Sequence, residues 1–112
     1  MDIRTETMKR CELISVVGQI DSATAPELDR TLQGLLAQGK RNLVLNLRET
    51  TFVSSAGLRG FVAAAIKARR MIPRGEVVFS EVPPSLVETF DVVGMRHLFK
   101  FFDSDVEAVG GF

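Results

Sequence analysis

The sequence predicts an α/β protein with a mixed, mostly parallel sheet of four to five strands packed against about four helices. Three observations support this. Short apolar runs rich in β-branched residues alternate with longer segments of helical periodicity, and glycine and proline fall between them. The length of 112 residues allows one domain, which we expect to span residues 1–112. A core of that size needs no metal or disulfide to fold.

The N-terminal third predicts a hairpin followed by a helix. Ile3–Thr7 and Leu13–Val17 favour two strands joined across a polar turn. Thr24–Glu27 (Thr-Ala-Pro-Glu) predicts the helix start, with Thr24 as the N-cap and the glutamate completing a capping box. Gly39 is expected to end the helix. The expected apolar stripe consists of Leu28, Leu32, Leu35 and Leu36.

The remaining chain repeats the alternation of strand and helix. Strands are expected over Leu43–Leu47, Val77–Phe79 and Phe99–Phe102, and helices after Ser55, from Pro83 to Gly94 and over Asp105–Val109. The expected buried face of the helix after Ser55 consists of Leu58, Phe61, Val62, Ala65 and Ile66. Small residues between them, Ala63–Ala65, suit close packing inside the molecule.

Composition excludes several classes of function. Fourteen basic side chains balance 14 acidic ones, which disfavours nucleic acid or an anionic membrane as a partner. No apolar run approaches a membrane span, and Met1–Cys11 is too polar for a signal peptide. The single Cys11 cannot pair within the chain, which suits the reducing cytoplasm. Cys11 and the single His97 lie far apart, so neither a metal nor a cofactor is expected. We therefore expect a non-enzymatic protein.

The most informative segment is Val53–Leu58 (Val-Ser-Ser-Ala-Gly-Leu), where two hydroxyls precede a helix. One reading is that Ser54 or Ser55 is an N-cap. A cap needs only one hydroxyl, however. A phosphoryl group on the other would lie where free N–H groups and the helix dipole stabilise an anion. A cap and a modification site can therefore coexist here.

The same segment also allows an enzymatic hypothesis. Val53–Gly57 partly resembles the G-x-S-x-G nucleophile elbow, although valine replaces the first glycine. The only candidate base for Ser55 is His97, which is expected in a helix-to-strand turn. A single imidazole in a chain of this size makes acyl transfer the weaker hypothesis.

Five segments, in order, resemble those of one known family. Gly18–Leu28 is similar to its G-x-x-D-x-x-T/S-A-x-x-L segment, Asn42–Leu47 to its central strand and Val53–Leu58 to its D/S-S-S/A-G-L signature. Gly94–Phe99 and Asp103–Ala108 resemble its closing pieces. The family is that of STAS domains, in particular bacterial anti-sigma factor antagonists. The resemblance extends over essentially the whole chain and implies the STAS fold.

The resemblance also implies a function. In such proteins the unphosphorylated form binds an anti-sigma factor that is a serine kinase of the GHKL ATPase type, and thereby releases the sigma factor or other target. Phosphorylation, here at Ser55 or alternatively at Ser54, blocks binding, and a PP2C-type phosphatase reverses it. The free protein is expected to be monomeric. The implied partner-binding residues are Asp21, Ser22, Thr24, Ser54, Ala56, Gly57 and Arg59.

Three departures from the family pattern leave alternatives open. Ser54 stands where many members carry aspartate, so either serine is a candidate acceptor. Ala56 stands where others carry a second serine or threonine, and Arg59 where others carry glycine. The alternative function keeps the fold without the switch, as a non-phosphorylated STAS scaffold subunit of a transporter or other multiprotein complex. As a loop charge before a helix, Asp21 is expected to be exposed, so that Asp21→Lys would weaken binding without unfolding the protein.

Overall fold

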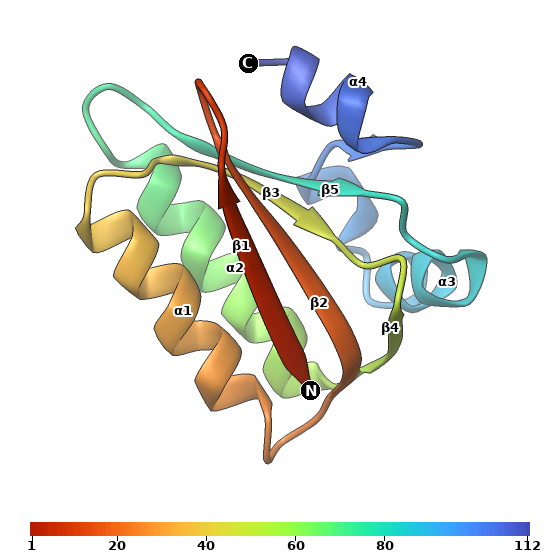
Figure 1. Ribbon diagram of the computed structural model, residues 1–112. Coiled ribbons are helices and arrows are strands. Elements are labelled where there is room, and N and C mark those ends of the chain that lie inside the picture. Colours follow the sequence, from red (N-terminus) through yellow and green to blue (C-terminus); the bar gives the residue numbers. More distant parts are fainter.

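The computed structural model describes residues 1–112 and has the mixed sheet that the sequence predicts (Figure 1). The strands are β1 (Asp2–Thr7), β2 (Glu12–Ile20), β3 (Asn42–Asn46), β4 (Thr50–Val53), β5 (Glu76–Ser80) and β6 (Phe101–Phe102). The helices are α1 (Ala25–Ala37), α2 (Ser55–Arg69), α3 (Pro84–Val92) and α4 (Asp105–Gly110), with a 3-10 helix η1 (Arg96–Leu98) after α3.

The sheet has the strand order β1-β2-β3-β5-β6, and only the β1–β2 pair is antiparallel. Along the edge that faces away from β1, the long strand β2 pairs with two strands in turn: its first half lies beside β3, and Gly18–Ile20 lies beside β4. The register shifts at Gly18, whose φ of 101° favours glycine. β4 is the strand that the sequence pattern does not predict. Its four residues show the burial order buried, exposed, exposed, buried, so no alternation reveals it.

Helices cover the sheet on both faces. α1 and α2 lie side by side against one face (Figure 1), and with α3 they enclose a core of 21 buried residues. Phe79 lies at its centre, with ring centroids 5.1 Å from Phe61 and 5.1 Å from Phe90. α4 packs on the opposite face, where Val44 and Val78 are buried with Cys11 and Ala108. No helix combines the length and the apolar composition that a membrane span requires.

Three local expectations are corrected. The capping box at α1 does not form, because Thr24 has helical backbone angles and its hydroxyl bonds to Gln19 and Asp21 instead. On α2, Ile66 is 44 % exposed, whereas Ala64 and Ala68 are fully buried. The buried stripe thus follows small residues, which let α1 approach α2. The last strand is shorter than expected, since Phe99 precedes β6.

Candidate functional site

The predicted site lies where the carboxyl ends of β2 and β4 meet. These parallel strands run side by side, with Ile20 opposite Val53. β4 leads into α2 across one residue, and β2 leads into α1 through the short loop 21–24. The backbone N–H of Ser54 donates to the carbonyl of Ile20 at 2.7 Å. The fold therefore brings the loop before α1 beside the first turn of α2, although they are about 30 residues apart in sequence.

The loop before α1 is built around the Asp21 carboxylate. Its Oδ1 accepts the backbone N–H groups of Ala23 and Thr24, each at 3.0 Å. The Thr24 hydroxyl accepts the Asp21 N–H at 2.9 Å and donates to the Gln19 carbonyl at 2.8 Å. The hydrogen bonds to the Asp21 carboxylate, above all the one from the Thr24 N–H, hold the pKa of Asp21 below its ordinary value. Asp21 is half-buried and shapes the turn, so the expectation of a simply exposed loop charge is wrong.

The two serines have different environments. Ser54 is the N-cap of α2: it has extended backbone angles, and its hydroxyl accepts the Gly57 N–H at 3.3 Å. Its side chain is half-buried. Ser55 is the first residue of the helix, is exposed, and makes no side-chain hydrogen bond. The cap and a free hydroxyl coexist, as the sequence suggests.

Gly57 explains why the first turn of α2 can lie against the strand ends. A Cβ at this position would come within 2.7 Å of the Ile20 Cγ2 and 3.1 Å of the Val53 Cγ1. Both side chains are buried and cannot move away freely. Gly57 itself is buried, so the structure does not place it on the expected partner-binding surface.

The other expected partner-binding residues reach the surface to different extents. Ser22 and Arg59 are exposed, whereas Thr24 and Ala56 are half-buried. Sequence reasoning missed Phe52, which is 49 % exposed on β4 three residues before Ser55. No signal in the sequence would have revealed it, because alternation places Phe52 on the same strand face as Thr50, which is buried.

His97 and Cys11 do not form a nucleophilic centre with these residues. His97 is exposed in η1, and no hydrogen bond joins it to Ser54 or Ser55. Burial raises the pKa of the Cys11 thiol, and the neighbouring Glu12 charge adds to this effect. The thiol is therefore protonated at neutral pH and a poor nucleophile.

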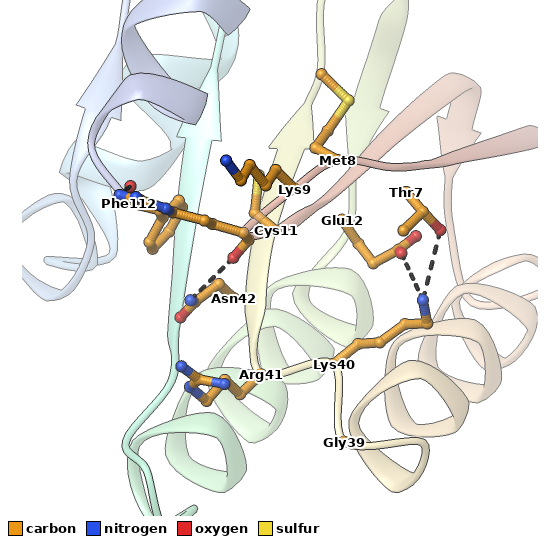
Figure 2. A pocket seen from close by; sticks show the side chains of 11 residues that line it. Thr7, Met8, Lys9, Cys11, Glu12, Gly39, Lys40, Arg41, Asn42 and Phe112 are labelled. Atoms are coloured by element: carbon orange, nitrogen blue, oxygen red, sulfur yellow. Dashed lines mark hydrogen bonds and ion pairs between the residues drawn. The ribbon is translucent and has the colours of Figure 1, made fainter.

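A cavity of about 520 Å³ lies elsewhere, between the β1–β2 turn and the loop before β3 (Figure 2). It contains none of the expected site residues. Four basic residues line it: Lys9, Arg10, Lys40 and Arg41. The Lys40 ammonium is already bonded to the Glu12 carboxylate at 2.9 Å and to the Thr7 hydroxyl at 3.4 Å, the two contacts drawn in Figure 2. Arg10 donates to the Phe112 carbonyl at 3.1 Å. These contacts tie the hairpin to the rest of the fold.

The site thus combines an exposed serine at the start of α2 with the Asp21 turn before α1, in a small α/β domain. Comparison with known proteins identifies its family, because the STAS domain profile matches residues 2–108. The chain belongs to the STAS domain family.

Relatives and solved structures agree with this family. BtrV of Bordetella bronchiseptica, named as an anti-sigma factor antagonist, is 33 % identical over 95 residues, which cover 85 % of this chain and 80 % of BtrV. An anti-sigma factor antagonist from Mycobacterium paratuberculosis has the same fold, with a TM-score of 0.85 at 21 % identity, covering 98 % and 92 % of the two chains. Phosphorylated Bacillus SpoIIAA, which is 15 % identical, has a TM-score of 0.77 and 97 % coverage of both chains.

Proposed function

We propose that this chain is an anti-sigma factor antagonist that works by partner switching in the cytoplasm. Its unphosphorylated form binds an anti-sigma factor with GHKL-type serine kinase activity and so frees the sigma factor or other target. The name of BtrV supports the general role. The observation that carries the switch is the exposed, unbonded Ser55 at the start of α2, beside the Asp21 loop.

The geometry favours Ser55 over Ser54 as the acceptor. The Ser54 hydroxyl caps α2, and its backbone is bonded to Ile20, so modification there would disturb the helix start. Ser55 has neither constraint. A phosphoryl group on Ser55 would lie near the free N–H groups of the first helical turn, which stabilise an anion.

The reaction is an ordinary phosphoryl transfer. The Ser55 Oγ attacks the γ-phosphorus of ATP, the bond from that phosphorus to the β–γ bridging oxygen breaks, and ADP leaves. The hydroxyl proton passes to a base of the kinase. A PP2C-type phosphatase reverses the modification by hydrolysis: water attacks the phosphorus, inorganic phosphate leaves, and the Ser55 Oγ takes up a proton. This chain supplies only the acceptor hydroxyl.

Modification would release the partner through charge. A phosphoserine carries about −1.5 to −2 charges at neutral pH. Buried in an interface, that charge loses its hydration, and it adds to the ionised Asp21 carboxylate on the same face. No change of backbone structure is required.

The test uses the kinase recovered by pull-down from the source cell, with ATP, and maps phosphate by mass spectrometry. Ser54→Ala should still be phosphorylated, at a reduced rate because the cap is lost, whereas Ser55→Ala should not. Ser55→Ala should also bind the kinase persistently, and Ser55→Asp should bind at least tenfold more weakly, or about 1.4 kcal/mol. Absence of phosphate from both serines, with partner binding retained, would instead support the scaffold role.

A further inference from the structure

We propose that Arg59 is the internal counter-ion of a phosphoryl group on Ser55. This inference rests on the proposed modification of Ser55 and concerns what the modified side chain contacts. Ser55 and Arg59 are four residues apart within α2. Side chains at this spacing lie on one helix face, with Cβ atoms roughly 5–6 Å apart.

The direction of the two side chains supports the pairing. Helical side chains lean toward the N-terminus of their helix, and this general preference favours a position of the Arg59 side chain over the turn that carries Ser55. Both residues are exposed, so neither is held in place by the core. The reach of an arginine side chain exceeds the separation of one helical turn, which makes the contact sterically accessible.

Arg59 is also free to form the pair. It makes no ion pair and no side-chain hydrogen bond, in contrast to Arg69, whose Nε and Nη2 donate to the Glu76 carboxylate and the Leu98 carbonyl. On α1, the acidic residue Asp29 lies close to Gly60 of α2. Its Oδ1 is 3.9 Å from the position that a Cβ on Gly60 would occupy. Asp29 does not engage Arg59, and Asp21 is already bonded within its own turn.

The chemistry of the two groups favours a specific contact. A phosphoserine offers three acceptor oxygens, and the planar guanidinium donates two parallel N–H bonds to such a group. The unpaired N–H groups of the first turn of α2 approach the same phosphoryl group from the backbone side.

Because of this pairing, phosphorylation changes the surface in two ways: it adds negative charge and it occupies the Arg59 guanidinium. In the free protein, the first turns of α2 present the exposed Arg59 cation, which forms no ion pair. In the phosphorylated protein, Arg59 is occupied by the phosphoryl group, and the face presents net negative charge. A partner that recognises the guanidinium therefore loses its contact in addition to meeting a new anion.

The experiment measures the second ionisation of the phosphate by ³¹P NMR. Phosphoserine is placed at position 55 by genetic-code expansion in the wild type, in Arg59→Gln and in Arg70→Gln, an exposed arginine at the far end of α2. We expect the phosphate pKa in the wild type to lie roughly half a unit below that in Arg59→Gln, about a threefold difference in dissociation constant. Arg70→Gln should match the wild type. Equal values in all three proteins would overturn the pairing.

A second measurement needs no variant. The Arg59 Nε–H resonance of the wild type should move downfield when Ser55 carries phosphate, and an unmoved resonance would contradict the pairing even if Arg59→Gln were unstable. Because the phosphoserine is installed without a kinase, the two ideas fail separately. A kinase that leaves Ser55 unmodified counts against the proposed function, whereas an unshifted phosphate pKa counts against the Arg59 contact.

Discussion

At the level of single residues, the Asp21 carboxylate combines a structural bond with a surface charge. Its Oδ1 closes the turn before α1 by accepting two N–H groups, and this arrangement keeps the group ionised. Asparagine retains the acceptor oxygen and removes the charge, whereas alanine removes both. The lysine substitution considered from the sequence alters both at once and cannot separate them.

We therefore predict that, at neutral pH, Asp21→Asn melts slightly below the wild type and binds the anti-sigma factor more weakly, whereas Asp21→Ala melts several degrees lower because it also loses the acceptor oxygen. Because the pKa of Asp21 is lowered in the folded protein, its charge stabilises the fold above the ordinary carboxyl pKa and ceases to do so as the pH falls. Circular dichroism and a binding titration measure the two effects. Equal binding by Asp21→Asn and the wild type would place the charge outside the interface.

At the level of elements, the position of α2 depends on the close approach at Gly57. Alanine there would gain roughly 1 kcal/mol of helix propensity. It would also force a Cβ to 2.7 Å from the buried Ile20 Cγ2, and overpacking of this kind costs about 1–3 kcal/mol. We predict that Gly57→Ala is destabilised by about 1 kcal/mol, measured by urea unfolding.

Gly34 provides the matched control on α1. It is exposed, and a Cβ there would meet no atom within 4 Å. Gly34→Ala should therefore be stabilised by up to about 1 kcal/mol through helix propensity alone. If both substitutions stabilised the protein, the first turn of α2 would be less tightly seated than the structure indicates.

Among the elements of the fold, some features could be predicted from the sequence and others could not. Local chemistry predicted that one of the two serines caps α2 and leaves the other hydroxyl free, and the structure assigns the cap to Ser54. Thr24 also fits a local capping rule, yet its hydroxyl bonds to Gln19, because the Asp21 turn competes for it. β4 depends on pairing with β2, more than 30 residues earlier, and four residues carry too little periodicity to reveal it.

At the level of the whole molecule, the order of strands and helices follows from alternating periodicities, and the STAS resemblance supplied the topology. Neither periodicity nor a family resemblance predicts ion pairs between residues that are far apart in the sequence. Glu12 is 3 % exposed at the start of β2, and Lys40, 28 residues later, reaches it at 2.9 Å. Neither residue stands out in the sequence, because their proximity exists only once the hairpin packs beside the loop that follows α1.

This ion pair predicts how global stability depends on pH. Burial opposes ionisation of Glu12, but hydrogen bonds from Lys40 and Thr7, together with the Lys40 charge, outweigh it and lower the Glu12 pKa. A carboxyl with a lowered pKa stabilises the fold fully above its unfolded pKa, and this contribution is lost as the pH falls through the folded value. Glu12→Gln should therefore be destabilised by about 1–2 kcal/mol at pH 7, and its difference from the wild type should shrink between about pH 5 and pH 3.

Asp2→Asn is the control for this prediction, since the Asp2–Arg4 pair is largely exposed and contributes little. Urea unfolding at several pH values, with an unchanged m-value, gives each free energy of unfolding. A Glu12→Gln difference that stayed constant from neutral to acidic pH would show that the charge of Glu12 does not stabilise this end of the molecule. If instead this difference in the free energy of unfolding shrinks toward acidic pH, the contact between the hairpin and the loop before β3 accounts for part of the acid sensitivity of the fold.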